Sequence, residues 1–121
     1  MFDFERLDLY QVIKDLNKKV YVFLKDNKTI DPFLVDQWKK ATFSILLNLS
    51  EGTGRMGLKD KQHFITIARG SVFECVAIAD FLKEAGEIEE DYYEDIYQGY
   101  EQISKMLLGM YRSYTKPKPQ Q

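Results

Sequence analysis

Apolar side chains recur every three or four residues along four segments of the chain, which is the spacing of one face of an α-helix. Alternation at every second position, the mark of a half-buried strand, is absent. The pattern therefore predicts four helices and no sheet. The apolar positions of these helices are, in chain order, Leu9, Val12, Ile13, Leu16, Val20, Phe23 and Leu24; Leu34, Trp38, Ala41, Ile45 and Leu49; Phe64, Ile65, Ala68, Val72, Cys75, Ile78, Ala79 and Leu82; and Tyr93, Ile96, Tyr100, Ile103, Leu107, Met110 and Tyr114.

Turn-forming residues mark where the helices begin and end. Asp31 followed by Pro32 is typical of a helix start, because the carboxylate caps free N–H groups and proline lacks only an N–H that the first turn leaves unbonded. The second helix is predicted to end at the Gly-Thr-Gly stretch 52–54, and Gly86 is predicted to stop the third helix. Asp91 is expected to start the fourth helix.

The turns between these helices are short, so consecutive helices must run antiparallel. The most economical arrangement is an all-α, up-down-up-down antiparallel four-helix bundle. No proline falls between positions 33 and 116, and no repeat divides the chain. Residues 1–115 are predicted to form a single four-helix bundle domain, with the third helix beginning near 58–60, and residues 116–121 are expected to be a disordered tail.

Composition narrows the class of protein. No run approaches the roughly 18 apolar residues that span a bilayer, and no basic-then-apolar segment at the N-terminus indicates export. Cys75 is the single cysteine, so an internal disulfide is excluded and a reducing, cytoplasmic location is expected. A formal net charge of −2 and a pI near 5.4 are lower than is usual for a dedicated nucleic-acid binder.

The helices carry more apolar surface than one bundle needs to bury. Aromatic residues make up 14% of the chain, and several large side chains stand outside the main apolar stripes. A helix that is apolar on two faces has to bury both, so a second copy of the chain is the expected partner. A wide core with loosely placed aromatic residues is the alternative. The predicted oligomer interface comprises Tyr21, Phe43, Leu46, Leu47, Phe73 and Phe81.

A strip of polar residues adjoins the apolar stripe of the second helix. Ser44, Asn48, Glu51 and Arg55 are four, three and four residues apart and so share one helix face. Glu74 lies in an apolar stretch of the third helix, where a carboxylate needs a partner such as an arginine. These five residues are predicted to form a structural network of hydrogen bonds and ion pairs; a catalytic or ligand-binding network is the alternative.

Residues 52–57 read Gly-Thr-Gly-Arg-Met-Gly, which matches the G-x-G-x-x-G fingerprint of dinucleotide sites. That fingerprint needs a preceding strand, and a helix is predicted there, so a turn is the expected structure. An anion held by Arg55, Lys59 and Lys61 at the start of the third helix stays open as a weaker reading. A single histidine cannot complete a di-metal site, and Cys75 lies among apolar residues. No cofactor, metal or catalytic residue is therefore expected.

The stretch 39–55 (Lys-Lys-Ala-Thr-Phe-Ser-Ile-Leu-Leu-Asn-Leu-Ser-Glu-Gly-Thr-Gly-Arg) resembles the signature of a bacterial family, the four-helix bundle proteins of 23S rRNA intervening sequences. The family pattern is a basic pair, then Ala-Ala-Val-Ser-Ile-Pro-Ser-Asn-Ile-Ala-Glu-Gly, then Gly-Arg, with a later Ala-x-Gly-Ser-x-x-Glu helix. The matching positions are Ala41, Ser44, Ile45, Asn48, Glu51, Gly52, Gly54 and Arg55, followed by Phe64, Ala68, Gly70, Ser71 and Glu74.

The resemblance implies a homo-oligomer, in the form of a pentameric ring of bundles, and no established enzymatic activity. Leu46 and Leu47 stand where the family has Pro-Ser, which implies a straighter and more apolar second helix. A related branch, the accessory proteins of diversity-generating retroelements, binds reverse transcriptase and nucleic acid through basic surfaces. This chain, with its net charge of −2, lacks that basic balance.

The expected function is that of a non-enzymatic, oligomeric scaffold or adaptor whose partner is itself and not a membrane. The alternative is a nucleic-acid-binding accessory protein that acts with an RNA or reverse transcriptase partner through a basic rim containing Arg55, Lys59 and Lys61. The turn after Glu84 is acidic and is expected at the opposite end of the bundle, so the two ends differ in charge. Solvated helix ends are the simpler explanation of that pattern.

Overall fold

The chain folds into four long α-helices preceded by one short 3-10 helix. The computed structural model describes residues 1–115; residues 116–121, predicted to be a disordered tail, lie outside the described part. The four-helix prediction is confirmed, and the described residues contain no strand. The elements are η1 (Asp3–Arg6), α1 (Asp8–Asp26), α2 (Pro32–Gly54), α3 (Leu58–Glu84) and α4 (Glu90–Ser113).

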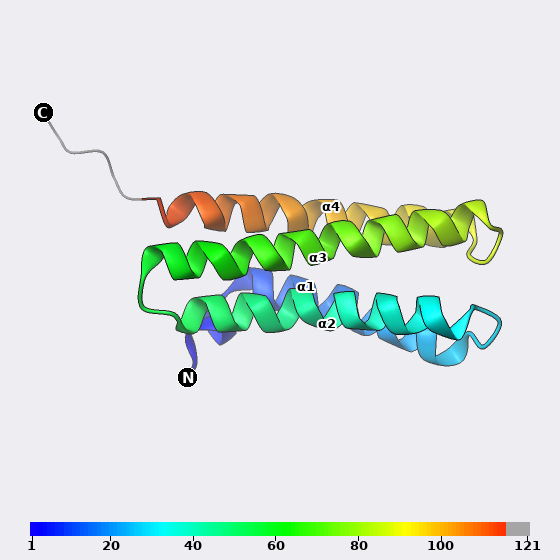
Figure 1. Ribbon diagram of the computed structural model, residues 1–121, viewed down its shortest axis with the longest axis horizontal. Coiled ribbons are helices and arrows are strands. Elements are labelled where there is room, and N and C mark those ends of the chain that lie inside the picture. The colour runs from blue at the N-terminus through cyan, green and yellow to red at the C-terminus, as the bar shows by residue number, and fades with distance from the viewer. Residues whose placement is uncertain (116–121) are drawn as a thin grey trace, which may run out of the picture.

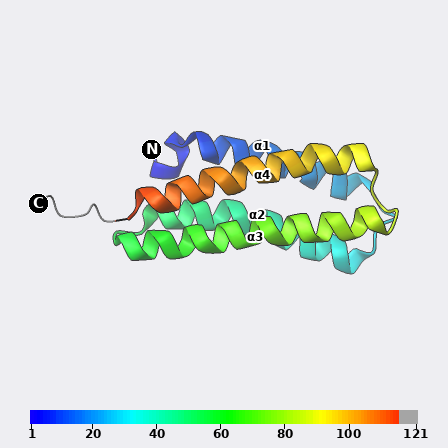
Figure 2. The same ribbon diagram turned by 90° about the horizontal axis from the view of Figure 1, so that it is seen from above.

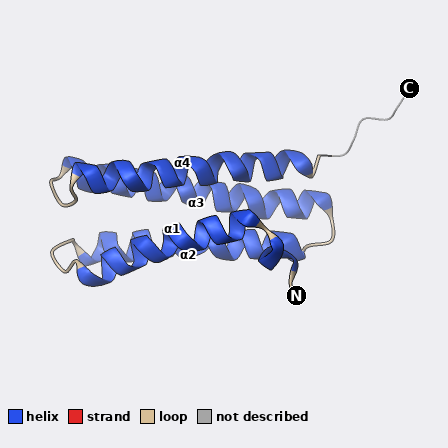
Figure 3. Cartoon of the chain, turned by 180° about the vertical axis from the view of Figure 1, so that it is seen from behind, coloured by secondary structure: helices blue, strands red, loops and turns tan. Residues whose placement is uncertain are grey.

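Successive helices run antiparallel and stand at the corners of a square (Figure 1). α2 packs against α1 and α3, and α4 packs against α3 and α1, while the backbones of the diagonal pairs stay apart within the described residues. α2 and α3 form one layer and α1 and α4 the other (Figure 2). The α2–α3 turn lies at one end, and the other two turns lie together at the opposite end (Figure 3). This is the predicted up-down-up-down bundle.

Local sequence explains where the helices begin and end. The Asp31 carboxylate accepts a hydrogen bond from the Phe33 N–H at 2.8 Å, and Pro32 is the first residue of α2, so the predicted cap is confirmed. Gly86 follows α3 with a φ of 77°, in the left-handed region that costs other residues about 1–2 kcal/mol. α4 begins at Glu90, one residue earlier than predicted, and η1 has no counterpart in the prediction.

The four apolar stripes meet in one continuous core, as their helical spacing predicts. Most of the predicted stripe positions are buried, and the remainder are half-buried at the margins of the core. Full burial of a large apolar side chain stabilises a fold by about 1.5–3 kcal/mol, so these contacts are the main favourable contribution. The largest completely buried side chains are Trp38, Tyr100, Ile13, Ile45, Leu49, Ile65, Leu82, Ile96, Ile103 and Leu107.

α2 and α3 approach each other closely, and small residues line their contact. A Cβ atom on Gly52 would lie 3.1 Å from Phe64 Cβ and 3.4 Å from the Lys61 carbonyl oxygen. Two turns earlier in α2, Ser44 Oγ lies 2.7 Å from Ser71 Oγ of α3. Interiors packed this closely leave no room for sliding, so these contacts fix the height of α2 relative to α3.

We expect Gly52→Ala to lower the free energy of unfolding by about 1–3 kcal/mol, because the added methyl group forces α2 away from α3. Gly109→Ala in α4 is the matched control. No atom lies within 4 Å of its Cβ position, so this change should raise the free energy of unfolding by about 0.5–1 kcal/mol. Urea denaturation measures both values. Equal effects of the two substitutions would contradict the close packing of α2 on α3.

Candidate functional site

The polar strip predicted along α2 divides into two separate groups, the first of which lies at the α2–α3 contact. Asn48 Nδ2 donates hydrogen bonds to the Ser44 carbonyl oxygen at 2.9 Å and to Ser44 Oγ at 3.0 Å. Ser71 Oγ of α3, which is absent from the predicted network, donates to Ser44 Oγ at 2.7 Å. Ser71 is buried and the other two residues are half-buried. The group therefore ties the two helices together through groups that satisfy one another.

Glu51 and Arg55 form the second group, at the end of α2. Arg55 Nη2 lies 2.6 Å from Glu51 Oε1, and the guanidinium stands over the Phe64 ring of α3, 4.5 Å from its centroid. About half of each charged side chain is exposed, so solvent screens the ion pair and it contributes only about 0.3–0.5 kcal/mol. The stacking on Phe64 holds the guanidinium against α3.

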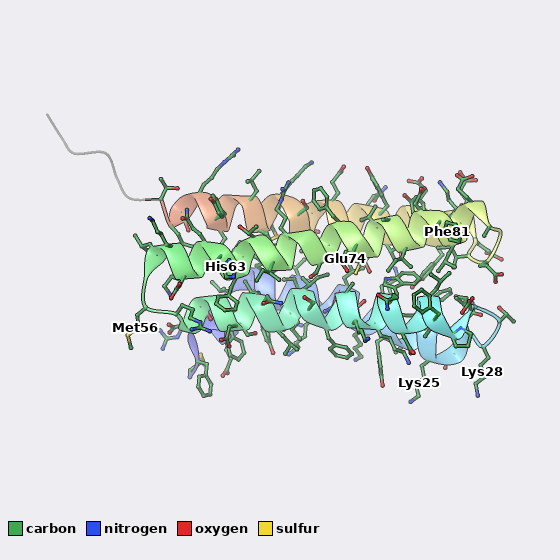
Figure 4. All side chains as sticks on the ribbon, in the orientation of Figure 1. Lys25, Lys28, Met56, His63, Glu74 and Phe81 are labelled. Atoms are coloured by element: carbon green, nitrogen blue, oxygen red, sulfur yellow. The ribbon has the colours of Figure 1, made fainter. Side chains whose placement is uncertain are left out.

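Glu74 lies apart from both groups. Its side chain is exposed on the outer surface of α3 (Figure 4), and within residues 1–115 it takes part in no ion pair. The reason is helical geometry, because Cys75 at the next position points into the core and leaves Glu74 facing solvent. The structure does not bring Glu74 into the predicted network or next to an arginine.

A buried polar group that is absent from the prediction links all four helices. Trp38 Nε1 of α2 donates to the Tyr100 hydroxyl of α4 at 3.0 Å. Asn17 Nδ2 of α1 donates to the Thr42 carbonyl oxygen of α2 at 2.8 Å, and Thr42 Oγ1 lies 3.9 Å from Cys75 Sγ of α3. Asn17 falls on the apolar stripe of α1, and that spacing is the signal that could have identified it.

Burial keeps the titratable members of this group neutral. It raises the pKa of the Cys75 thiol to about 11 and raises the pKa of the Tyr100 phenol well above its usual value. The thiolate is the reactive form of cysteine, so a thiol with this pKa is a poor nucleophile at neutral pH. Cys75 is completely buried, as its apolar neighbours in the sequence predict, and serves as a small core residue.

The basic residues at the α2–α3 turn are partly engaged within the chain. Lys61 Nζ donates to the Thr53 carbonyl oxygen at 2.9 Å and stands over the Tyr114 ring, 5.6 Å from its centroid. Lys59 is exposed. The glycine-containing stretch 52–57 forms the end of α2 and the turn, so a helix occupies the place of the strand that a dinucleotide fingerprint requires.

Metal and membrane sites find no support in the described residues. Within residues 1–115, no three His, Cys, Asp or Glu side chains are grouped so that they could hold a metal ion. In the same part of the chain, no helix has both the length and the apolar character needed to span a bilayer.

Large apolar side chains stand exposed on the outer side of α1 and α2. Phe43 is 44% exposed and Leu47 is 62% exposed, and Tyr21 contacts Phe43 edge-on with ring centroids 6.0 Å apart. Leu46, also in the predicted interface, is half-buried against the core. The surface formed by Tyr21, Phe43 and Leu47 is termed the α1–α2 face.

A groove runs between α3 and α4 on the opposite side of the bundle and is termed the α3–α4 groove. Phe73 at its edge is 56% exposed, and the Arg69 guanidinium stands over the Phe73 ring at 4.9 Å. Arg69 separates a hollow of about 320 Å³ from a larger hollow of about 480 Å³. Tyr111 lines the smaller hollow and Tyr97 lines the larger one, and neither tyrosine belongs to the predicted interface.

Phe81 lies on neither of these surfaces. It is 61% exposed near the end of α3, on the side of that helix that also carries His63 and Glu74 (Figure 4). The structure therefore places the predicted interface residues on three surfaces rather than on one. Only Tyr21, Phe43 and Leu47 form a compact exposed patch.

Removing the Tyr100 hydroxyl is expected to lower the free energy of unfolding by about 1–3 kcal/mol, because the Trp38 N–H then stays buried without an acceptor. Tyr111→Phe is the matched control, since Tyr111 is exposed and its loss of a hydroxyl should change stability by less than about 0.5 kcal/mol. Thermal and chemical denaturation of Tyr100→Phe and Tyr111→Phe test the difference. Wild-type stability in Tyr100→Phe would contradict a role for this hydrogen bond.

Stability is expected to fall as the pH rises above the ordinary thiol pKa of 9.0. Below that pH the Cys75 thiol is protonated in the folded and the unfolded chain. Between pH 9.0 and about 11 the unfolded chain loses this proton and the folded chain does not. The free energy of unfolding therefore falls by up to about 1.4 kcal/mol per pH unit in this range. Denaturation of wild type and Cys75→Ala at about pH 8 and about pH 10 measures this linkage. Identical pH dependence in the two proteins would contradict it.

Comparison with known proteins gives a family and a fold. Residues 5–109 match the family of 23S rRNA-intervening sequence proteins. Among solved structures, a crystal structure at 1.70 Å resolution of a protein of unknown function from the S23 ribosomal protein family of Bacteroides thetaiotaomicron VPI-5482 is similar, with a TM-score of 0.81 and 18% sequence identity, covering 85% of this chain and 97% of that chain. At this identity the likeness shows the fold alone. No curated protein matches the chain. Because the family match covers most of its length, the chain belongs to the family of 23S rRNA-intervening sequence proteins.

Proposed function

We propose that this protein is a non-enzymatic homo-oligomer, a ring of five copies, that serves as a scaffold or adaptor in the cytoplasm. The observation that carries the proposal is the exposure of large apolar side chains on two opposite sides of a bundle whose core is already complete. Each copy in a ring contacts two neighbours through two different surfaces. Apolar surfaces on opposite sides are therefore what ring formation requires.

The amount of exposed apolar surface supports association. Phe43, Leu47 and Phe73 each leave about half or more of the side chain in solvent. Full burial of such a side chain is worth about 1.5–3 kcal/mol, so covering these three and the neighbouring tyrosines contributes several kcal/mol to one interface. Association of two proteins costs about 4–15 kcal/mol in lost freedom. Ring closure helps offset that cost, because the last copy forms two interfaces for one loss of freedom.

The polar side chains support a structural role rather than a catalytic one. Ser44, Asn48 and Ser71 bond to one another, and Glu51 bonds to Arg55. Each group directs its hydrogen bonds at the chain itself. Glu51 and Arg55 also line an open surface hollow beside Phe4 and Leu47, where the guanidinium is paired with Glu51. Catalysis by a nucleophile needs a base within hydrogen-bond reach of that nucleophile, and the nucleophile must be accessible to a substrate. Neither of these two groups provides both features.

The alternative, binding of RNA or DNA with a reverse transcriptase partner at Arg55, Lys59 and Lys61, has less support. Arg55 is paired with Glu51, and Lys61 is bonded to the Thr53 carbonyl oxygen. A polyanion would have to displace these contacts before it could use either cation. The net charge of −2 also opposes the long-range attraction on which such binding depends.

Phe43→Ser combined with Leu47→Ser is expected to reduce the molar mass in solution towards the 14.3 kDa of one chain, with no loss of helix, because both residues lie outside the core. Met56→Ser is the matched control. Met56 is fully exposed in the turn between α2 and α3, at the end of the bundle (Figure 4), so the mass should not change. Light scattering at micromolar concentration measures the mass, and circular dichroism measures the helix. A wild-type mass of 14.3 kDa would overturn the proposal.

A further inference from the structure

We propose that the α1–α2 face of one copy docks against the α3–α4 groove of the next copy, at the same height along the bundle. This inference rests on the proposed homo-oligomer and goes further, because it names the two surfaces that meet. α1 and α2 form one side of the square and α3 and α4 form the opposite side (Figures 1 and 2). In a ring whose axis runs parallel to the helices, the layer of α1 and α4 and the layer of α2 and α3 each stay at the same distance from the axis in every copy. α1 of one copy therefore meets α4 of the next copy, and α2 meets α3.

The two sides carry opposite charges at the same spacing. α1 and α4 each carry a set of four exposed side chains, made up of three like charges and one tyrosine. In both sets the members are four, three and four residues apart, so each set lies on one face of its helix. The basic set on α1 is Lys14, Lys18, Tyr21 and Lys25. The acidic set on α4 is Glu90, Glu94, Tyr97 and Glu101.

Contacts with neighbouring residues show where these two sets point. Tyr21 belongs to the α1–α2 face, and Lys39 of α2 stands over its ring at 5.9 Å, which adds a fourth lysine to that face. Tyr97 and Glu101 line the larger hollow of the α3–α4 groove, together with Asp80 of α3. Tyr21 of the basic set therefore lies within the apolar patch, and Tyr97 and Glu101 of the acidic set lie at the hollow.

Contacts inside the bundle fix the relative heights of α1 and α4. A Cβ atom on Gly99 would lie 3.0 Å from Leu16 Cδ2, and the Phe23 ring is stacked on the Tyr92 ring with centroids 4.2 Å apart. Leu16 is thus level with Gly99, and Phe23 is level with Tyr92. Since the helices are antiparallel, a step forward along α1 corresponds to a step backward along α4.

The two charged sets consequently lie at matching heights. Lys14 comes two residues before Leu16 along α1, and Glu101 comes two residues after Gly99 along the antiparallel α4. The two charged side chains therefore lie at the same height. By the same argument from Phe23 and Tyr92, Lys25 is level with Glu90. Copies related by a ring axis share one height, so Lys14 and Lys25 of one copy face Glu101 and Glu90 of the next, while Lys18 is level with Tyr97 and Tyr21 with Glu94. Such complementarity fixes the register of an interface and excludes contacts between like faces.

The apolar patch has the same register. The Ser44–Ser71 contact makes Phe43 level with the Phe73 region, beside the larger hollow, and places Leu47 about one turn further along, at the smaller hollow. The groove also contains two basic side chains. Lys105 Nζ lies 3.8 Å from Glu101 Oε1, and the Arg69 guanidinium is stacked over the Phe73 ring.

Cysteine pairing between two different variants tests the docking. Lys18→Cys and Tyr97→Cys lie at one height on opposite sides of the bundle, so they cannot bond within one chain. We expect oxidation of a co-expressed mixture to give a disulfide-linked dimer that contains one chain of each kind, while each variant alone gives none. The native Cys75 is buried and serves as the unreactive internal control.

Three results separate the docking from the oligomer itself. A disulfide between two Lys18→Cys chains would show that like faces meet and would overturn the docking. An oligomeric wild type whose mixed variants fail to cross-link would also overturn the docking and leave the oligomer standing. A monomeric wild type would overturn both proposals.

Charge reversal provides an independent measurement. Lys14→Glu with Lys25→Glu should weaken association at least about tenfold, and adding Glu90→Lys with Glu101→Lys to the same chain should restore it, because attraction returns with the signs exchanged. Lys28→Glu, in the α1–α2 turn at the end of the bundle, is the control and should have no such effect (Figure 4). A fourfold variant that associates more weakly than the double variant would overturn the docking.

Discussion

The close approach of α2 to α3 is the constraint on which the other surfaces of the molecule depend. Gly52 allows the backbone of α2 to lie against Phe64, and the Ser44–Ser71 hydrogen bond holds the same two helices further along. These contacts leave α2 no freedom to slide. Phe43 and Leu47 on the far side of α2 therefore keep a fixed position relative to the groove beside α3. A change at the glycine would disturb surfaces that it does not touch.

The helices could be predicted from the sequence because their signals are local. Spacing by three and four residues identifies each buried stripe, and the bonds of Asp31 and the left-handed Gly86 are set by residues next to them in the chain. The orientation of Glu74 and the hydrogen-bond partner of Asn17 could not be predicted in this way. A carboxylate between apolar residues can face either the core or solvent, and an amide on a buried stripe needs a partner from another helix, here the Thr42 carbonyl oxygen.

The surplus of apolar side chains was visible in the sequence, but the division of that surplus into surfaces was not. Phe43 and Leu46 are only three positions apart on α2, yet the first is exposed and the second leans against the core. Tyr97 enters an exposed groove only because α3 lies beside α4 and leaves a hollow there. Which residues share a surface depends on the heights and rotations of neighbouring helices, and spacing within one helix carries no information about either.

Trp38 is the one tryptophan of the chain, and its indole lies wholly in the core with its N–H bonded to Tyr100. The indole itself lines neither hollow of the α3–α4 groove and is not part of the α1–α2 face, the two surfaces at which neighbouring copies would meet. Its fluorescence should therefore report the integrity of the individual bundle and change little when copies associate. This separation offers a way to observe, in one solution, whether a substitution on the outside disassembles the protein or unfolds it.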